Sequence, residues 1–267
     1  MNYRKLLLNN FTYKTSYVAK HAAKMIVKET KDYVKVDCGL PTDTFNIITL
    51  LNNDVMEEKQ ELCAEIEYFN QKKFPMSVWF WETNQDDTLV SELKQLGLKE
   101  AEKNVAMVVD LKTIDPIIDV PAGFTIQKAA SSLHIQKFGD TLSSLFGTSA
   151  EGTSVQAYYN QISSLELWDH KDVSLYLGIF EDEVVSIGSL ICTTDSIGIY
   201  DIATKEKMRE RGFGSAMFNF LLNEAKKQKE LYCVLQASPD GINIYKKSGF
   251  QPVGRMIVFE NRHLLEA

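Results

Sequence analysis

The sequence predicts an α/β protein built on a mixed sheet. Three observations support this class. Apolar patterns of strand type and helix type alternate along the chain, a polar Glu181-Asp182-Glu183 turn separates two β-rich runs, and residues 213–228 carry an apolar stripe at helical spacing. With 267 residues, of which 45% are hydrophobic and 24% charged, the chain can bury a sizeable core as one large or two small domains.

The two parts of the chain differ in glycine content, because only Gly39 and Gly97 precede residue 120 and the other twelve glycines follow it. The segment from Asp110 to Gly123 holds two of the six prolines and is typical of a linker. We therefore expect two domains, 1–118 and 119–267. The elements expected in the first part are helices at 14–29, 56–72 and 87–96, a turn at 38–43, and extended segments or strands at 33–37, 45–51, 76–81 and 104–111.

The second part alternates more regularly than the first. Its expected helices are 131–146, 153–165, 213–228 and 241–248, and its expected strands are 124–128, 173–180, 184–192, 196–203, 231–237 and 252–260. In the third of these helices the apolar side chains recur on one face, which suits packing on a sheet.

Charge and the scattered cysteines and histidines exclude several classes of function. The net charge of −7 argues against a nucleic-acid partner, which needs a basic face. Cys38, Cys63, Cys192 and Cys233 form no C-x-x-C pair, and the four histidines form no ligand motif, so we expect reduced thiols and no metal. No apolar run reaches a signal-peptide core or a membrane span, and we expect a cytoplasmic protein without a membrane partner.

A glycine turn between a strand and a helix is the most informative feature. The β-rich run 197–204 is followed by four cations and two carboxylates between Lys205 and Arg211, and then by Gly212 and Gly214 at the start of the amphipathic helix. Glycines let the backbone approach a ligand, and the first N–H groups of a helix attract an anion. The basic segment can recruit an anion to an otherwise acidic protein.

Three phosphate-binding motifs compete for this turn. Residues 212–217 fit neither the Walker pattern nor the dinucleotide pattern G-x-G-x-x-G. The spacing Arg209-x-x-Gly212-x-Gly214 does fit the R/Q-x-x-G-x-G/A signature, and it is followed after the helix by 234–238 and 244–250. Over residues 123–262 the chain therefore resembles the GNAT N-acetyltransferase superfamily.

This resemblance implies a GNAT fold in the carboxyl-terminal half and acetyl-CoA as the co-substrate. The strand before the signature would splay from its parallel neighbour, and its end would pair with the pantetheine arm. The backbone of the signature would hold the pyrophosphate. The residues that the resemblance places at the cofactor are Ile202, Ala203, Thr204, Arg209, Glu210, Arg211, Gly212, Phe213, Gly214 and Ser238, the last standing where many members have Asn.

The resemblance also implies catalytic roles, for which alternatives remain open. Tyr245 matches the tyrosine that protonates the leaving thiolate, although it could be a half-buried packing residue. Asp201 is the first candidate for the base, through a water, and could face either the substrate or the solvent. Tyr200 is the alternative base, and a base could also be needed only to strip an ammonium in bulk solvent. The glycines could be a turn and nothing more.

The amino-terminal half resembles the GNAT-like first half of tandem acetyltransferases. The matching segments are Cys38-Gly-Leu-Pro-Thr-Asp-Thr-Phe-Asn46 and Phe74-Pro-Met-Ser-Val-Trp79. This half lacks the R-x-x-G-x-G signature, so the resemblance implies a degenerate domain that holds no pyrophosphate. It would build one wall of the acceptor site or stabilise the fold.

Three functions follow as alternatives. The first is an N-acetyltransferase that moves an acetyl group from acetyl-CoA to a primary amine, on a small molecule or a peptide, by direct attack in a ternary complex. The second is a CoA-binding regulatory or scaffolding module without turnover, and the third is a relative that transfers an aminoacyl group or makes a thiol cofactor. The sequence does not specify the acceptor, and we expect segment 146–153 to select it because of its loop-like composition.

Overall fold

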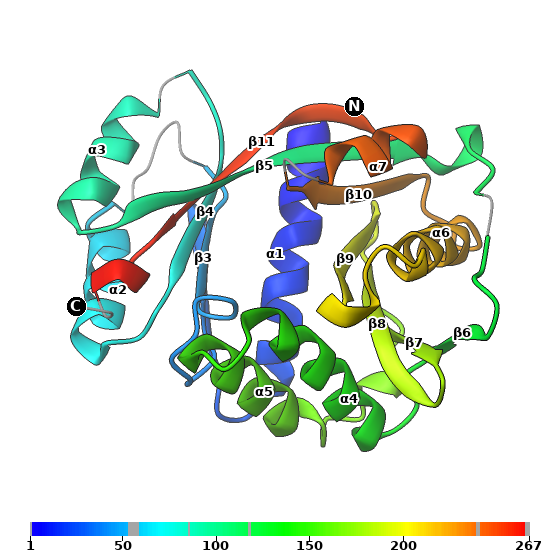
Figure 1. The fold of residues 1–267 in the computed structure, drawn as a ribbon. Coiled ribbons are helices and arrows are strands. Elements are labelled where there is room, and N and C mark those ends of the chain that lie inside the picture. The colour runs from blue at the N-terminus through cyan, green and yellow to red at the C-terminus, as the bar shows by residue number, and fades with distance from the viewer. Residues whose placement is uncertain (1, 53–58, 85, 117–118, 239–240, 265–267) are drawn as a thin grey trace.

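The computed structural model describes residues 2–52, 59–84, 86–116, 119–238 and 241–264. It confirms the predicted α/β class, because helices pack on a mixed sheet of eleven strands that runs through both halves (Figure 1). The expected domain boundary at residue 118 lies outside the described residues.

The strands are β1 (Ile26–Glu29), β2 (Tyr33–Asp37), β3 (Ile47–Leu50), β4 (Ser77–Trp81), β5 (Lys99–Asp110), β6 (Phe124–Lys128), β7 (Val173–Phe180), β8 (Glu183–Cys192), β9 (Ile197–Thr204), β10 (Tyr232–Ala237) and β11 (Gln251–Glu260). The helices of the described residues are α1 (Tyr3–His21), α2 (Lys59–Lys72), α3 (Asp87–Gln95), α4 (Ser132–Ser143), α5 (Ala150–Ile162), α6 (Phe213–Lys226) and α7 (Ile242–Lys247).

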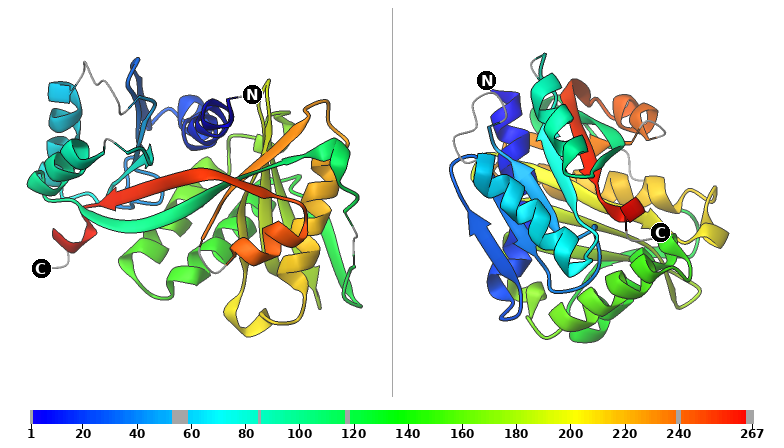
Figure 2. Two further views of the ribbon diagram at one scale, coloured as in Figure 1. Left: turned by 90° about the horizontal axis from the view of Figure 1, so that it is seen from above. Right: turned by 90° about the vertical axis from the view of Figure 1, so that its left-hand side faces the viewer.

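The two halves share one sheet instead of forming two. The strand order is β1-β2-β3-β4-β11-β5-β10-β9-β8-β7-β6. Strand β11, from the end of the chain, pairs with β4 and β5 of the first half, and β5 pairs on its other side with β10 of the second half. Figure 2 shows β5 and β11 crossing from one half to the other. Neither half could be excised without exposing unpaired strands.

The first helix differs most from the prediction. A helix was expected at 14–29, whereas α1 spans Tyr3–His21 and residues Ile26–Glu29 form the edge strand β1. The Asn2 side chain accepts a hydrogen bond from the Lys5 N–H and caps the helix start. The prediction failed because β1 has only four residues and is held as a strand by its pairing with β2. So short an edge strand has no recognisable apolar pattern of its own in the sequence.

Most other elements lie within a few residues of their predicted bounds. Strand β5 is the exception, since it begins at Lys99 and was expected at 104. Its first residues are exposed and polar, and they are held as a strand by pairing with β11. The expected start of the helix at 56 lies outside the described residues, which resume at Lys59.

Apolar side chains cover both faces of the sheet in the carboxyl-terminal half. Neighbouring residues of β9 alternate between two cores: Tyr200 packs with α1, α4 and α5, whereas Ile199 packs with α6. Helix α6 presents the predicted stripe, and Met217 and Leu221 on it are fully buried. The two faces of β9 therefore lead to two different environments.

Helix α1 belongs to the first half of the sequence, but it is hydrogen-bonded to strands of the second half. The buried Asn10 side chain donates to the Ile191 carbonyl at 3.2 Å and to the Ser196 hydroxyl at 3.0 Å. Its amide oxygen accepts from the Tyr200 hydroxyl at 2.9 Å. One helical turn further on, Lys14 faces the same sheet.

Candidate functional site

Strands β9 and β10 separate after two paired positions. Ile197 pairs with Cys233 and Gly198 with Val234, and no further parallel pairs join the two strands within the described residues. Beyond this point, in the part of the chain that the structure describes, β9 pairs with β8 alone and β10 with β5 alone. One backbone edge of β9 is therefore left without a strand partner, as the family resemblance implied.

The glycine turn lies beyond the end of this unpaired edge. Gly212 has a φ of +83° and stands immediately before helix α6, and Glu210 has a φ of +61°. A Cβ on Gly214 would lie 3.2 Å from the Thr204 hydroxyl, a tight contact that the absence of a side chain avoids where the first turn of α6 approaches β9. The first N–H groups of α6, which have no acceptor within the helix, therefore lie beside the end of β9.

A cavity of about 320 Å³ joins the strand end, the glycine turn and helix α7. We call it the glycine-turn cavity. Eight of the predicted site residues line it, namely Ile202, Thr204, Arg209, Glu210, Gly212, Phe213, Gly214 and Tyr245. It is also lined by four residues that the sequence analysis did not single out, namely Met208, Ser215, Phe218 and Ile244.

Three predicted cofactor residues do not line this cavity. Ala203 faces the opposite core, because side chains alternate along a strand. The Arg211 guanidinium lies 4.5 Å from the centre of the Phe180 ring and 5.1 Å from that of the Phe213 ring, and it donates to the Met208 sulfur at 3.2 Å. The Ser238 hydroxyl accepts a hydrogen bond from the Gly241 N–H at 3.3 Å, which makes it a turn residue before α7.

Tyr245 reaches the glycine-turn cavity from α7. Its ring packs edge-on against Phe218, with 5.0 Å between ring centres. No hydrogen bond to its hydroxyl is found among the described residues, and burial raises the pKa of the phenol. The ring of Tyr245 therefore packs in the core while its protonated hydroxyl lines the cavity, and its role as an acid stays a prediction.

Asp201 lies on the other side of β9. Its φ of +53° marks a bulge, where the register of β8 against β9 shifts between Ile187 and Ser189. The carboxylate accepts a hydrogen bond from the Ser189 hydroxyl at 2.8 Å and lies 3.2 Å from the Lys14 ammonium. The carboxylate lines a cavity and its side chain is 17% exposed, and its role toward a substrate stays a prediction. Asp201 and Tyr245 line different cavities.

The alternative base, Tyr200, is unsuited to that role. Its hydroxyl donates to Asn10, and burial raises the pKa of the phenol. A base must lose a proton readily near neutral pH, which a buried phenol with a raised pKa does not do.

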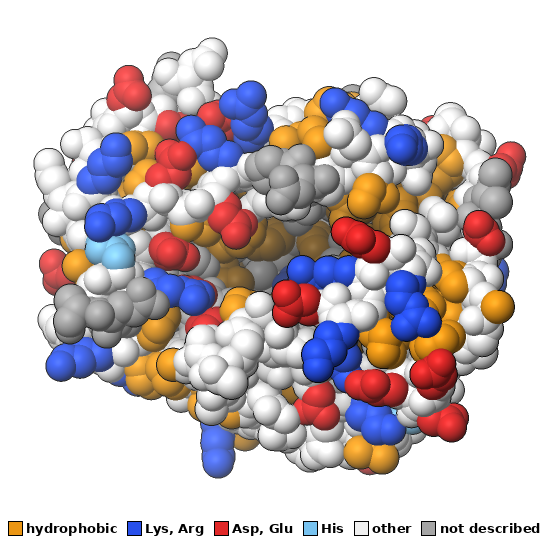
Figure 3. All heavy atoms as spheres, in the orientation of Figure 1, with side chains coloured by type: hydrophobic (Ala, Val, Ile, Leu, Met, Phe, Trp, Pro, Cys, Tyr) orange, Lys and Arg blue, Asp and Glu red, His pale blue; other side chains and the backbone are white. Residues whose placement is uncertain are grey.

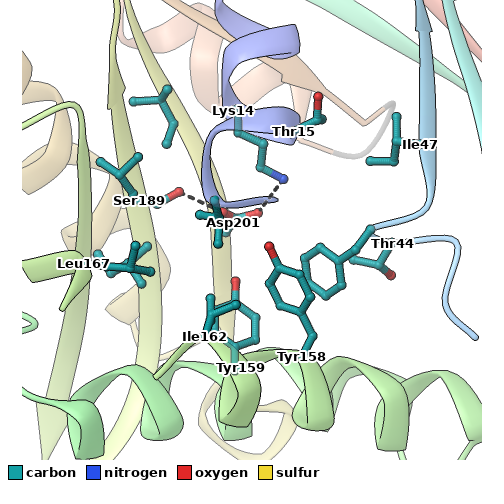
Figure 4. A pocket seen from close by; sticks show the side chains of 15 residues that line it. Lys14, Thr15, Thr44, Ile47, Tyr158, Tyr159, Ile162, Leu167, Ser189 and Asp201 are labelled. Atoms are coloured by element: carbon teal, nitrogen blue, oxygen red, sulfur yellow. Dashed lines mark hydrogen bonds and ion pairs between the residues drawn. The ribbon is translucent and has the colours of Figure 1, made fainter. Parts of the chain in front are cut away.

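The cavity that Asp201 faces lies between the halves. We call it the inner cavity. It has a volume of about 50 Å³, and α1, the segment at 44–47, helix α5 and strands β7 to β9 line it (Figure 4). Sequence reasoning missed Lys14, Tyr158 and Tyr159 at this cavity, because α1 and α5 come together here only through the fold.

An outer cavity of about 330 Å³ adjoins the inner one and shares Lys14, Thr44 and Ile47 with it. Its other residues come from both halves and include Trp79, Glu102, Phe146 and Arg262. Figure 3 shows a hollow near the centre of this face, with apolar side chains in its floor and charges of both signs around it.

The segment expected to select the acceptor is only partly a loop. Helix α5 begins at Ala150, after the Ser149 N-cap, and Phe146 is the residue of 146–153 that lines the outer cavity. Glu151 is buried, where it accepts hydrogen bonds from the Thr42 and Thr44 hydroxyls. Glu151 therefore holds the two halves together, and the selecting role of the segment stays a prediction.

Within the described residues, no group of three or more acidic, histidine or cysteine side chains is placed to hold a metal ion. Among the helices described, none combines the length and apolarity that crossing a membrane requires.

Comparisons with known proteins agree with this geometry. The family model for an acetyltransferase (GNAT) domain matches residues 172–252, which include β7 to β10 and the glycine turn. No curated protein sequence matches the chain.

Solved structures share the fold over most of the chain. A GCN5-related N-acetyltransferase from Kribbella flavida aligns over 96% of this chain and 95% of its own, with a TM-score of 0.66 and 13% identity. A functionally unknown conserved protein from Staphylococcus epidermidis aligns over 87% and 92%, with a TM-score of 0.63 and 18% identity. A tandem GNAT protein from the clavulanic acid biosynthesis pathway aligns over 96% and 94%, with a TM-score of 0.57 and 10% identity. Residues 172–252 thus match the GNAT acetyltransferase domain family, and the chain as a whole shares the fold of these solved structures, a tandem GNAT protein among them.

Proposed function

We propose that this protein is a cytoplasmic N-acetyltransferase that moves an acetyl group from acetyl-CoA to a primary amine by direct attack in a ternary complex. One observation carries the proposal: the edge of β9 that lacks a strand partner leads directly to a glycine turn at a helix N-terminus. An extended amide-containing arm can pair with such an edge while its phosphates lie on the helix N–H groups.

The residues at the turn fit the anionic end of CoA. Gly214 leaves space beside Thr204, and α6 has no acidic side chain in its first turn to repel a phosphate. The Arg209 side chain donates to the Thr204 carbonyl at 3.4 Å, which holds a cation at the end of the open strand edge. We propose that the α6 amides hold the pyrophosphate and that Ile202 and Thr204 contact the pantetheine arm.

The amine would reach the thioester from the opposite face of the sheet. Asp201 lies there, one residue before Ile202, at the bulge of the strand that would hold the cofactor. We propose that Asp201 accepts a hydrogen bond from the attacking amine and passes its proton to water. Residues 119–267 would supply the cofactor site, and residues 1–118 one wall of the acceptor site through α1 and 44–47.

The reaction joins the amine nitrogen to the acetyl carbon and breaks the bond from that carbon to sulfur. The sulfur leaves as a thiolate, whose charge needs a nearby donor. Tyr245 supplies this donor in the proposal. Because burial raises its pKa and a thiol has a pKa near 8.5, the phenol stabilises the thiolate mainly by donating a hydrogen bond, and water completes the protonation.

Release of free thiol from acetyl-CoA, measured over a panel of primary amines, tests the proposed function. We expect thiol release that depends on both the enzyme and an amine. A protein that binds CoA but releases no thiol with any amine in the panel would contradict acetyl transfer and support the alternative, a CoA-binding regulatory or scaffolding module.

A further inference from the structure

The inner cavity combines an apolar interior with a cluster of polar atoms at one end. Seven aliphatic side chains line the interior, namely Val18, Ile47, Ile162, Leu167, Val173, Leu175 and Ile191. The polar atoms are the Lys14 ammonium, the Asp201 carboxylate, the Ser189 hydroxyl and the hydroxyls of Tyr158 and Tyr159. Figure 4 shows Lys14 and Ser189 approaching Asp201 from two sides.

Two phenol hydroxyls in this cluster lack a protein partner. Tyr158 is 6% exposed and Tyr159 is 5% exposed, yet neither hydroxyl has a hydrogen bond within the described residues. Both point from α5 towards Asp201 (Figure 4). Because both hydroxyls face the cavity, a ligand inside it can accept a hydrogen bond from each of them. Burial raises the pKa of both phenols, which keeps them protonated as donors.

The ion pair at this end joins the two halves and leaves both charges within reach of a ligand. The Lys14 ammonium lies 3.2 Å from one Asp201 oxygen, and their side chains are 20% and 17% exposed. The other Asp201 oxygen accepts from Ser189. One cation, one anion and two neutral donors therefore converge on one small space.

This set of groups complements a zwitterion. We infer that the acceptor is an α-amino acid with a small aliphatic side chain, whose ammonium binds Asp201, whose carboxylate binds Lys14 and a tyrosine hydroxyl, and whose side chain enters the aliphatic interior. Binding replaces one ion pair with two. The inference rests on the proposed function, because the nitrogen held at Asp201 is the one that would take the acetyl group.

The size of the cavity limits the side chain. At roughly 10–15 Å³ for each group of the size of water, 50 Å³ holds three to five such groups. The three side-chain carbons of valine fit this space, and the charged groups of the amino acid would lie at its polar end, where Lys14 also lines the outer cavity. The ammonium gives up one proton through Asp201 to water, and its nitrogen then bonds to the acetyl carbon as the carbon–sulfur bond breaks. The nitrogen loses a second proton by the same route and the thiolate takes one up from water, so the products are an N-acetyl amino acid and the free thiol.

The test compares L-valine with L-valinamide, which keeps the amine and the side chain but lacks the carboxylate charge. Calorimetric titration of the full chain should show valine binding about tenfold more tightly, since a hydrogen bond to a charged group contributes roughly 1.5–3 kcal/mol. In Lys14→Met, which keeps the apolar stem, the preference should fall to less than about threefold. In Lys20→Met, an exposed lysine of the same helix paired with Glu29, it should stay unchanged.

Two results would overturn the inference. One is wild-type protein that binds valinamide as tightly as valine, a comparison that needs no variant. The other is a valine preference that persists in Lys14→Met. Because these titrations measure binding without turnover, they stand apart from the thiol-release assay. Valine binding without thiol release would overturn acetyl transfer and leave the zwitterion site in place.

Discussion

Removing a single oxygen atom, by Tyr245→Phe, separates the chemical role of this residue from its packing role. The ring lies against Phe218 at 5.0 Å and Phe250 at 6.3 Å, and the substitution keeps both contacts. Since no hydrogen bond holds the hydroxyl within the described residues, its loss should change the free energy of unfolding by less than about 1 kcal/mol.

The effect on turnover should be much larger. The thiolate would lose one charge-assisted hydrogen bond, worth roughly 1.5–3 kcal/mol in the transition state, which corresponds to a fall in kcat of about 10²-fold. Because burial raises the pKa of Tyr245, the wild-type rate should show no loss from phenol ionisation below about pH 10.

Thiol release under saturating acetyl-CoA gives kcat, and calorimetry gives the cofactor affinity, which should change little. Tyr176→Phe is a matched control, because Tyr176 packs in the same core against Phe220 and burial raises its pKa to about 12, but it does not line the glycine-turn cavity. An unchanged kcat in Tyr245→Phe with a loss of stability would refute the assigned role and leave Tyr245 as a packing residue.

Three further predictions concern the stability of the fold and, for one of them, the affinity for CoA. Arg211→Ala should lower the free energy of unfolding, measured in urea, by roughly 0.5–1 kcal/mol, because the stacking on Phe180 is lost. The affinity for CoA should be nearly unchanged, and a large loss of that affinity would contradict the prediction. Glu151→Gln should cost roughly 1–3 kcal/mol, because it removes a buried charge that accepts from two threonines, and unaltered stability would be inconsistent with that network. Burial raises the pKa of Asp37, but hydrogen bonds from Tyr68, Gly39 and Lys72 outweigh it and lower the pKa below its ordinary value. The ionised carboxylate therefore stabilises the fold above about pH 4, and this stabilisation is lost as the pH falls through the lowered pKa. Asp37→Asn should destabilise the protein at pH 7 and progressively less below pH 4, and a loss of stability that does not depend on pH would contradict this.

Local patterns predicted much of the carboxyl-terminal half. Alternation and the turn at 181–183 placed β7, β8 and β9 within one or two residues, because each of these strands carries its own apolar period. The spacing of Arg209, Gly212 and Gly214 identified the turn, and the structure brings most of the predicted cofactor residues into one cavity. Strand alternation explains why Ala203, between Ile202 and Thr204, turns to the other side.

The acceptor side could not be predicted in the same way. Lys14 lies on α1 and Asp201 on β9, and they meet because Asn10 fastens α1 to the sheet of the other half. The pairing of β11, from the end of the chain, with β4 of the first half could not be predicted either. The register of such a pair depends on residues far apart in the sequence, and no local pattern records it. For the same reason, expressing residues 1–118 alone would not test what that half binds.

Calorimetric titration of CoA into the full chain tests the central claim most directly, which is that the glycine turn and the open edge of β9 form the cofactor site. We predict binding by the wild type and a loss of at least about 100-fold in Gly214→Asp, where a carboxylate would stand against the pyrophosphate and a Cβ against Thr204. Ser132→Asp, which adds the same charge at the exposed start of α4, should bind as the wild type does. No binding by the wild type at millimolar CoA, or equal binding by a folded Gly214→Asp, would contradict the claim.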